Sequence, residues 1–225
     1  MKLQYPKAYG NSCIFREDFT SWQHVADNGG IVTGVPTISN GIQETVFHGT
    51  NAVYNLGRNW FVLAQQRMTL ILDFTTTAAP PGSGNYILWK GPYGGTSQFT
   101  AVQQTEQNVR LYLPASIGDT DPFIRSSPLS NSTRYRLAFV YDGTLAGNSN
   151  RIKLYTNGVQ DVGVYINGTI PANLLSASTG LEVLTANSII GTKINQLRIF
   201  DRALSADEIL DDYQQDSILE VELGP

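Results

Sequence analysis

KINQLRIFDRALSADEILDDYQ, residues 193–214, joins a strand-like run directly to a short helix near the end of the chain. Ile194, Leu197 and Ile199 are apolar and have polar residues between some of them, which is the loose alternation of a half-buried strand. The segment therefore predicts that the last strand of the fold leads without a linker into a helix.

The residues LSADEI within this segment mark the start of that helix. Ser205 is a good N-cap and Glu208 follows it at the spacing of a capping box. Leu204 before the cap and Ile209 inside the helix form the matching hydrophobic staple. The sequence predicts a helix over residues 206–213, and we expect it to be structural.

The composition indicates one large β domain. The chain has 225 residues, of which 41% are hydrophobic and 15% charged, so it can bury a sizeable core. A net charge of −4 with no basic cluster argues against nucleic-acid binding. The one cysteine, Cys13, excludes an intrachain disulfide and a metal site built on cysteines.

The N-terminal residues MKLQYPKAYGNSCIF do not have the pattern of a signal peptide, because they lack a long apolar run and are interrupted by Pro6 and Gly10. No stretch of the sequence approaches the length of a membrane span. We therefore expect a protein that is made in the cytosol and has no membrane span.

Short strand-like runs separated by turn residues recur along the chain. They lie at residues 12–20, 45–49, 52–56, 68–77, 85–90, 98–103, 108–114, 134–142, 150–158, 161–167 and 188–200. Many short strands at this spacing predict an antiparallel β-sandwich or jelly roll. Alternation is clearest in RYRLAFVY, where Tyr135, Leu137, Phe139 and Tyr141 share one face.

The chain contains no repeat or linker that would separate two domains. We predict one domain over residues 12–213, flanked by an N-terminal arm at residues 1–11 and a C-terminal arm at residues 214–225. The last stretch, SILEVELGP, alternates in residue type and predicts a strand placed after the fold is complete.

Three segments resemble the laminin-G-like, concanavalin A-like jelly rolls. RYRLAFVYDGTLAGNSNRIKLYTNGVQD resembles a hairpin of that superfamily, and INQLRIFDRALSADEILDDY resembles its closing strand and helix. VFHGTNAVYNLG, followed by MTLILDF, resembles its early strands. The resemblance covers residues 12–213. It implies an all-β sandwich whose final strand returns beside the N-terminal strand, with one short C-terminal helix over that end.

The superfamily includes lectins, carbohydrate-binding modules, adhesion domains, glucanases and parts of virus particles, so the fold leaves the function open. Glycoside hydrolysis needs two carboxylates flanking the bond. Hydrolases of this fold carry them on one strand with an E-x-D-x-x-E type spacing, and this sequence has no such run. The nearest cluster, Glu208 with Asp211 and Asp212, is expected to be a solvated helix face. We expect no catalytic activity, with a glycoside hydrolase or polysaccharide lyase as the most distant alternative.

The resemblance also implies a structural calcium ion between the first and the closing strand. The closing-strand acids common in the superfamily are replaced here by Asn195 and Gln196. Asp18, Asn28 and Asn195 can still supply oxygen ligands, so a calcium site is left open. No other cofactor is expected.

Aromatic residues with polar neighbours are the candidates for glycan binding, because sugars are held by an aromatic face and planar polar groups. Trp89 and Tyr93, with Lys90 between them, are the first candidate. Trp60 beside Asn59 is the second. The alternative for Trp89 is a place in the core at the end of its strand.

The function ranked first from the sequence is a structural or surface-exposed component of a virus particle, such as a bacteriophage capsid decoration or a tail or fibre accessory protein. Such a protein is made in the cytosol, lies on the virion surface and can meet host glycans. Its tail would add to a sheet edge of a protein partner, through Ile218, Leu219, Val221 and Leu223. A carbohydrate-binding, lectin-like module is the alternative.

Overall fold

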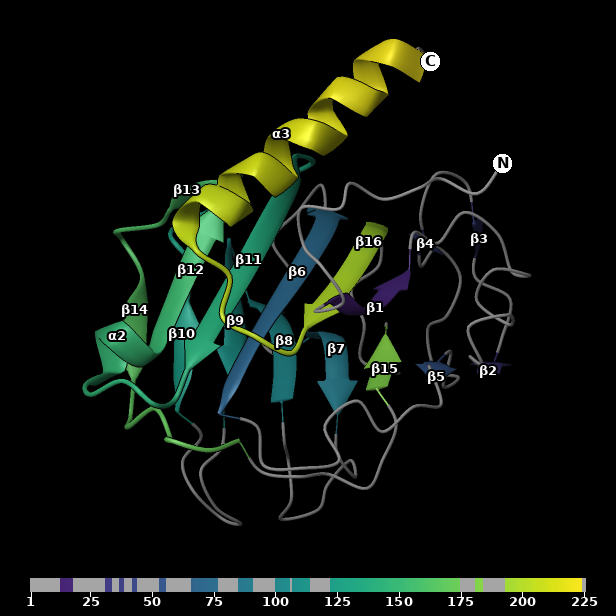
Figure 1. Ribbon diagram of the computed structural model, residues 1–225. Coiled ribbons are helices and arrows are strands. Elements are labelled where there is room, and N and C mark those ends of the chain that lie inside the picture. The colour runs from purple at the N-terminus through teal and green to yellow at the C-terminus, as the bar shows by residue number, and fades with distance from the viewer. Residues whose placement is uncertain are drawn as a thin grey trace.

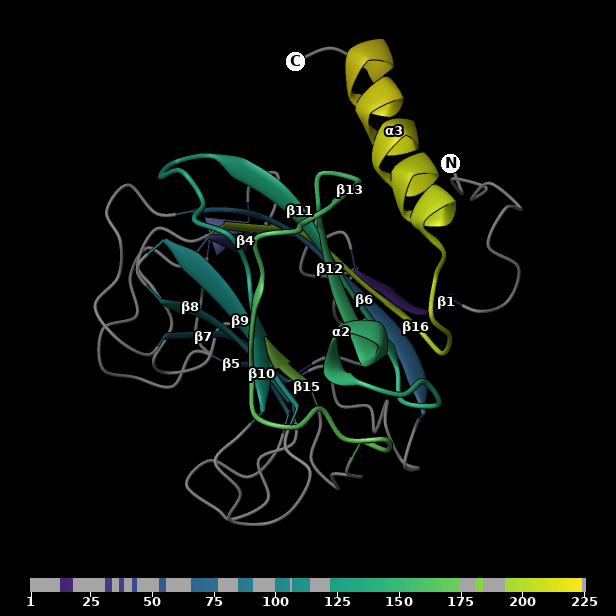
Figure 2. The same ribbon diagram turned by 90° about the vertical axis from the view of Figure 1, so that its left-hand side faces the viewer.

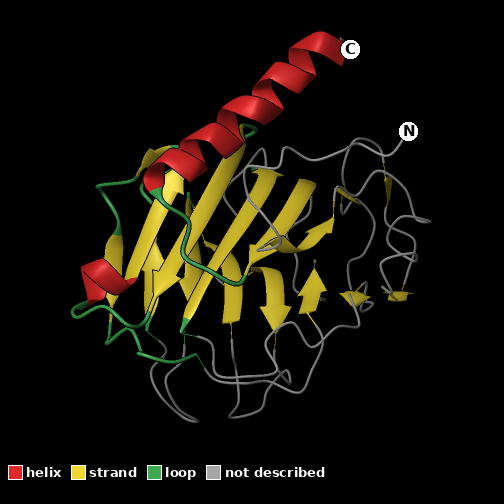
Figure 3. Cartoon of the chain, in the orientation of Figure 1, coloured by secondary structure: helices red, strands yellow, loops and turns green. Residues whose placement is uncertain are grey.

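The computed structural model describes the backbone of residues 13–17, 31–33, 37–38, 42–43, 53–55, 66–76, 85–90, 100–105, 107–113, 122–174, 181–183 and 193–223. Side chains are described for residues 13, 66–76, 107–113, 122–174 and 193–215. These residues form two antiparallel sheets packed face to face, with a helix on the outer side of one sheet (Figures 1 and 2). The all-β sandwich with a C-terminal helix is therefore confirmed (Figure 3).

The first sheet has the strand order β13-β12-β11-β6-β16-β4-β3, and β1 also pairs with β16. Its strands are β1 (Cys13–Glu17), β3 (Thr37–Ile38), β4 (Ile42–Gln43), β6 (Arg67–Thr75), β11 (Arg134–Asp142), β12 (Ile152–Thr156), β13 (Val159–Gln160) and β16 (Lys193–Phe200). The pairing of β1 with β16 confirms that the closing strand lies beside the N-terminal strand.

The second sheet has the strand order β14-β10-β9-β8-β7-β15-β5-β2. Its strands are β2 (Ile31–Thr33), β5 (Val53–Asn55), β7 (Asn85–Lys90), β8 (Thr100–Thr105), β9 (Asn108–Tyr112), β10 (Phe123–Arg125), β14 (Tyr165–Asn167) and β15 (Leu181–Val183). β14 lies at one edge of this sheet, in the order that the pairing gives.

The main core fills the space between the two sheets. The first sheet contributes residues such as Phe74 and Phe139, and the second contributes Leu111 and Ile124, all of which have no exposed surface. Burying each side chain of this size stabilises the fold by about 1.5 to 3 kcal/mol relative to leaving it in water.

The outer face of the first sheet is buried as well, beneath the start of α3 (Ala206–Leu223). Ala138 and Val140 on β11 lie in a second apolar cluster with Leu204 and Ile209. Both faces of β11 are therefore covered, one by the second sheet and one by the helix. This is why β11 carries apolar residues on the face opposite Phe139.

The predicted capping box and staple are present at the start of α3. The Glu208 N–H donates to the Ser205 Oγ at 3.2 Å, and the Ser205 N–H donates to a Glu208 carboxylate oxygen at 2.9 Å. Leu204 and Ile209 are each 3% exposed. The helix start is thus fixed by local sequence, as the pattern indicated.

Glu208 makes the stability of the fold sensitive to acid. Hydrogen bonds from Arg202 at 2.6 and 2.8 Å, aided by Ser205, lower the Glu208 pKa to about 2 from 4.5. A depressed folded-state pKa gives stability that is present above the unfolded pKa and is lost as the pH falls. We expect about 1 kcal/mol to be lost between pH 4.5 and 2, because the pair is partly exposed. Denaturation of Glu208→Gln over the same range should lack this component.

α3 is longer than predicted, and the predicted C-terminal strand is wrong. The helix continues through residues 214–223 and extends past the strands of the sandwich (Figure 1). These residues include no Gly or Pro, and Gln, Leu and Glu favour helices. Once the capped first turn has formed, each further residue adds a hydrogen bond at low cost. Alternation over so few residues does not outweigh that continuation.

Two other predicted strands begin later than expected. Residues 148–151 form the short helix α2 (Asn148–Arg151), and β12 begins only at Ile152. The predicted strand at residues 161–167 opens with a turn, because the Asp161 carboxylate accepts from the Gly163 N–H at 2.9 Å and from Ser127. The predicted run at residues 45–49 lies outside the described residues.

Candidate functional site

The predicted glycan-binding residues fall partly within the described structure. Trp89 and Lys90 are the last residues of β7, which has the bounds that the sequence predicted. Tyr93, Trp60 and Asn59 lie outside the described residues. The structure therefore locates the strand of the first candidate.

The cross-strand register places Trp89 in a defined row of the second sheet. That row runs through Trp89, Ala101, Tyr112, Phe123 and Asn167. The adjacent row runs through Leu88, Val102, Leu111, Ile124 and Ile166. Leu111 and Ile124 face the core between the sheets. Since alternate residues of a strand lie on opposite faces, Tyr112 and Phe123 lie on the outer face of the second sheet, and Trp89 shares their register row.

Aromatic and arginine side chains gather on this outer face near the β14 edge. The Tyr112 and Phe123 rings lie 5.3 Å apart, and the Phe123 and Tyr165 rings lie 6.0 Å apart, both tilted. The Arg110 guanidinium lies 5.1 Å from the Phe123 ring centre, and that of Arg125 lies 4.9 Å from the Tyr165 ring centre. We call these five residues the aromatic–arginine surface.

The aromatic–arginine surface belongs to the second sheet, whereas α3 lies over the first sheet (Figure 2). Tyr165, on the edge strand β14, is 49% exposed, and the other members are partly exposed. Tilted ring pairs and guanidinium–ring contacts hold the surface in shape. A partly apolar surface with polar edges can bind a ring that has one apolar and one polar side.

The sequence prediction missed this surface. The alternation in NVRLYL puts Arg110 and Tyr112 opposite Val109 and Leu111, which is a usable signal for an outer face. β10 and β14 have three residues each, too few to show a period. The adjacency of the three strands is a property of the topology, which the sequence pattern does not contain.

Asn195, the predicted calcium ligand on the closing strand, lies at a β-bulge of β16 between Ile194 and Gln196. Its side-chain nitrogen donates to an Asp73 carboxylate oxygen at 3.0 Å. Asp18 and Asn28 lie outside the described residues, so the calcium site stays a prediction. Among the described residues, no group of three or more His, Cys, Asp or Glu side chains is placed to hold a metal ion.

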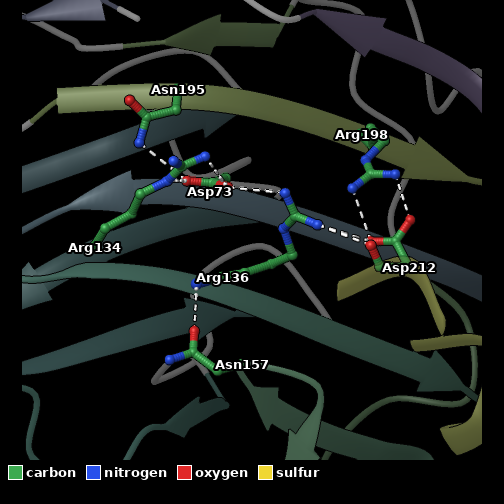
Figure 4. A network of polar contacts seen from close by, with 7 residues as sticks. All are labelled: Asp73, Arg134, Arg136, Asn157, Asn195, Arg198 and Asp212. Atoms are coloured by element: carbon green, nitrogen blue, oxygen red, sulfur yellow. Dashed lines mark hydrogen bonds and ion pairs between the residues drawn. The ribbon is translucent and has the colours of Figure 1, made fainter. Parts of the chain in front are cut away.

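A network of charges centred on the buried Asp73 lies on the outer side of the first sheet (Figure 4). Arg134 donates to both Asp73 carboxylate oxygens, at 2.7 and 2.9 Å, and Arg136 donates to one of them at 2.9 Å. Burial alone would raise the Asp73 pKa, but the hydrogen bonds and charges of these arginines lower it below its ordinary value. Asp73 is therefore held ionised.

Asp212 ties α3 to this network. Arg198 on β16 bonds both Asp212 carboxylate oxygens, one of them at 2.7 Å, and Arg136 donates to the Asp212 carbonyl at 3.0 Å. The expectation that Asp212 belongs to a solvated face is wrong, since it is only 2% exposed. Asp211, its neighbour on the helix, is exposed as expected. The network positions the helix on the sheet.

The four residues proposed as an assembly arm lie in the part of α3 for which only the backbone is described. They are Ile218, Leu219, Val221 and Leu223. Their backbone is helical, so they do not form the edge-adding strand that the sequence analysis expected. Whether they meet a partner stays a prediction.

The profile of the concanavalin A-like lectin/glucanases superfamily matches residues 48–210 of this chain. The chain belongs to this superfamily. The match includes β11, β12, the closing strand and the start of α3, and so confirms the resemblance seen in the sequence. A comparison with curated protein sequences finds no match.

Several solved structures are similar to this chain in fold. The binding domain of botulinum neurotoxin serotype D has a TM-score of 0.63 and 12% identity, covering 83% of this chain and 46% of that one. The Ruminococcus gnavus IT-sialidase CBM40 bound to α2,3-sialyllactose has a TM-score of 0.56 and 13% identity, covering 89% and 98%. Identities this low show the fold alone.

A third similar structure is the ligand binding domain of botulinum neurotoxin serotype D in complex with N-acetylneuraminic acid. Its TM-score is 0.59 at 12% identity, and the match covers 83% of this chain and 44% of that one. The chain spans about half the length of the neurotoxin domains that it matches. Within the described part of the chain, none of the helices combines the length and apolar character needed to cross a membrane.

Proposed function

We propose that this chain is a non-catalytic glycan-binding module that holds sugars on the outer face of its second sheet. The observation that carries the proposal is the aromatic–arginine surface, where the Phe123 ring lies 5.3 Å from the Tyr112 ring and 6.0 Å from the Tyr165 ring. Aromatic rings with polar tips suit ligands that are apolar on one side and polar on the other.

The cross-strand register supports a wider platform. The register row that contains Tyr112 and Phe123 continues across the sheet to Trp89 on β7. Trp89 is the first glycan-binding candidate predicted from the sequence. A row of this kind crosses several strands at a spacing of about 4.8 Å per strand. That length is enough for more than one sugar ring to lie along it.

The similar proteins support the proposal by class. Two of the similar structures are complexes with a sugar. The CBM40 is bound to α2,3-sialyllactose, and the neurotoxin ligand binding domain is in complex with N-acetylneuraminic acid. The superfamily profile names lectins as well as glucanases. Glycan binding is therefore a function that this fold carries elsewhere.

The absence of catalysis is part of the proposal. A glycosidase acid needs a raised pKa and a second carboxylate close by. Asp73 and Glu208 instead have pKa values below their ordinary ones, because arginines bind them. Asp212 is likewise bound by Arg198. Because arginines bind these three carboxylates, they suit structural roles better than the role of a catalytic acid.

Replacing Tyr165 by alanine should weaken glycan binding about tenfold, which corresponds to about 1.4 kcal/mol. Tyr165 is on an edge strand and half exposed, so the melting temperature should change little. The measurement is a glycan array of the purified chain, with and without calcium, followed by calorimetry on the best sugar. Val162→Ala is the matched control, because Val162 is 92% exposed and precedes β14.

The proposal fails if the unmodified chain binds no sugar on the array, or if Tyr165→Ala binds as tightly as Val162→Ala. Loss of binding in EDTA would in addition support the calcium site predicted at Asp18, Asn28 and Asn195.

The virus-particle role, the virion-surface location and the synthesis in the cytosol stay predictions from the sequence. No contact of the described residues bears on them. If residues 214–223 do contact a particle partner, their helical backbone means that they would dock as a helix.

A further inference from the structure

Arg110 and Arg125 face each other across β9 and β10 as direct cross-strand partners. Two like charges in such a pair destabilise a sheet. The fold keeps both on its outer surface, beside the three aromatic rings. Their position therefore calls for a physical explanation beyond the stability of the sheet.

The other arginines with described side chains all bond carboxylate or carbonyl oxygens. They are Arg67, Arg134, Arg136, Arg151, Arg198 and Arg202. Within the described residues, Arg110 and Arg125 have no carboxylate partner; Arg110 bonds the Tyr112 hydroxyl at 3.4 Å, and each guanidinium lies over a ring. Among the arginines with described side chains, these two are the ones that bond no described carboxylate or carbonyl oxygen.

Contact with an aromatic ring restrains a guanidinium and leaves N–H groups that can donate to a ligand. Planar guanidinium groups bind carboxylates through two parallel hydrogen bonds, which a lysine cannot reproduce. Arg110 over Phe123 and Arg125 over Tyr165 are therefore preorganised donors next to a surface that suits a sugar ring.

We propose that the aromatic–arginine surface selects acidic glycans, with the carboxylate of a sialic or uronic acid bound by Arg110 and Arg125 and the sugar rings lying on Tyr112, Phe123 and Tyr165. This inference rests on the proposed glycan-binding function and adds the class of ligand. The chain as a whole carries a net charge of −4, so it does not attract anions in general. Selectivity for acidic sugars would therefore come from the local pair of Arg110 and Arg125.

The test compares acidic and neutral sugars of matched structure on the full chain. Calorimetry is run with sialyllactose against lactose, and with a glucuronic-acid disaccharide against its glucose counterpart, at 50 and 500 mM salt. We expect the acidic member of at least one pair to bind at least tenfold more tightly at low salt, and the difference to shrink at high salt because the ion pair is partly screened.

Arg110→Gln and Arg125→Gln should each remove most of this preference while leaving binding of the neutral sugar unchanged. Arg125→Lys should fail to restore it, because the amine lacks the planar fork. Arg67→Gln is the matched control, since Arg67 is exposed and lies on the first sheet. Melting curves of each variant exclude loss of folding, and either glutamine variant suffices if the other does not fold.

The outcomes separate the two proposals. Equal affinity for acidic and neutral sugars, or an acidic preference that survives both glutamine variants, overturns the selectivity while glycan binding stands. No binding of any sugar overturns the proposed function and the selectivity together. An acidic preference lost in the glutamine variants and kept in Arg67→Gln establishes the inference.

Discussion

Replacing Asp212 by alanine should lower the free energy of unfolding by about 3 to 5 kcal/mol. Asp212 is 2% exposed, and its arginine neighbours Arg198 and Arg136 are 5% and 6% exposed. Removing the carboxylate takes the bidentate anion away from the buried Arg198 guanidinium beneath α3, while Arg136 keeps its ion pair with Asp73. Chemical denaturation of the variant measures the change.

Asp211→Ala is the matched control, because it removes the same side chain from the adjacent, exposed position of the same helix. Its effect should stay within about 0.5 kcal/mol. If Asp212→Ala costs no more than Asp211→Ala, the ion pairs to Arg198 do not hold the helix on the sheet.

A double variant separates the charge from the packing. Replacing Asp212 by leucine and Arg198 by methionine together should be less destabilising than Asp212→Ala, because buried ion pairs are often replaced by apolar residues at little cost. The free energies of unfolding of the unmodified chain, of the single variants Asp212→Leu and Arg198→Met, and of the double variant form a double-mutant cycle. Its coupling term measures the interaction between Asp212 and Arg198. A coupling near zero would contradict the role assigned to this pair.

Replacing Gly143 by alanine should cost about 3 kcal/mol through overpacking. A Cβ at Gly143 would collide with the Ala172 carbonyl oxygen and with the Tyr141 hydroxyl. Neither neighbour can move easily, since Tyr141 is fully buried and its hydroxyl donates to the Pro171 carbonyl at 2.8 Å. Gly143 itself is held by its N–H, which donates to the Gln66 carbonyl at 2.7 Å.

Gly147→Ala is the control that separates crowding from backbone strain. Gly147 has a φ of 81°, but a Cβ there would meet only the Asn150 amide nitrogen at 3.9 Å. Strain alone should cost about 1 to 3 kcal/mol, because φ 81° with ψ 144° is a conformation almost exclusive to glycine. Thermal and chemical denaturation compare the two variants, and an equal or smaller loss in Gly143→Ala would show that the neighbours relax.

Structural features that depend on residues close together in the sequence were predicted correctly. The Ser205–Glu208 capping box and the Leu204–Ile209 staple involve residues within one turn, so their spacing alone specifies the contacts. The long strands β6 and β11 were predicted nearly to the residue, because nine residues suffice to show a period. The short strands β4 and β10 were missed, because two or three residues are too few to show a period.

Charged residues were predicted poorly where the partner lies far away in the chain. Asp212 was expected in solvent, because its helix neighbours are acidic and its partners Arg136 and Arg198 lie on two different strands. The contact of the Asn195 side-chain nitrogen with Asp73, at the bulge of β16, was not predicted, and the calcium site at Asn195 stays a prediction. A bulge re-aims a side chain through one extra residue, which alternation does not reveal.

The sequence by itself determined the sandwich class, the closing strand and the capped start of α3, because apolar periodicity and capping act over a few residues. The tertiary structure decided that the outer face of the first sheet is buried under that helix, and that Asp73 and Asp212 are held by arginines. It also decided that β9, β10 and β14 are neighbours, which brings the Arg110–Arg125 pair and three rings onto one surface. Pairing of strands distant in the chain depends on the whole fold, so no local pattern contains it.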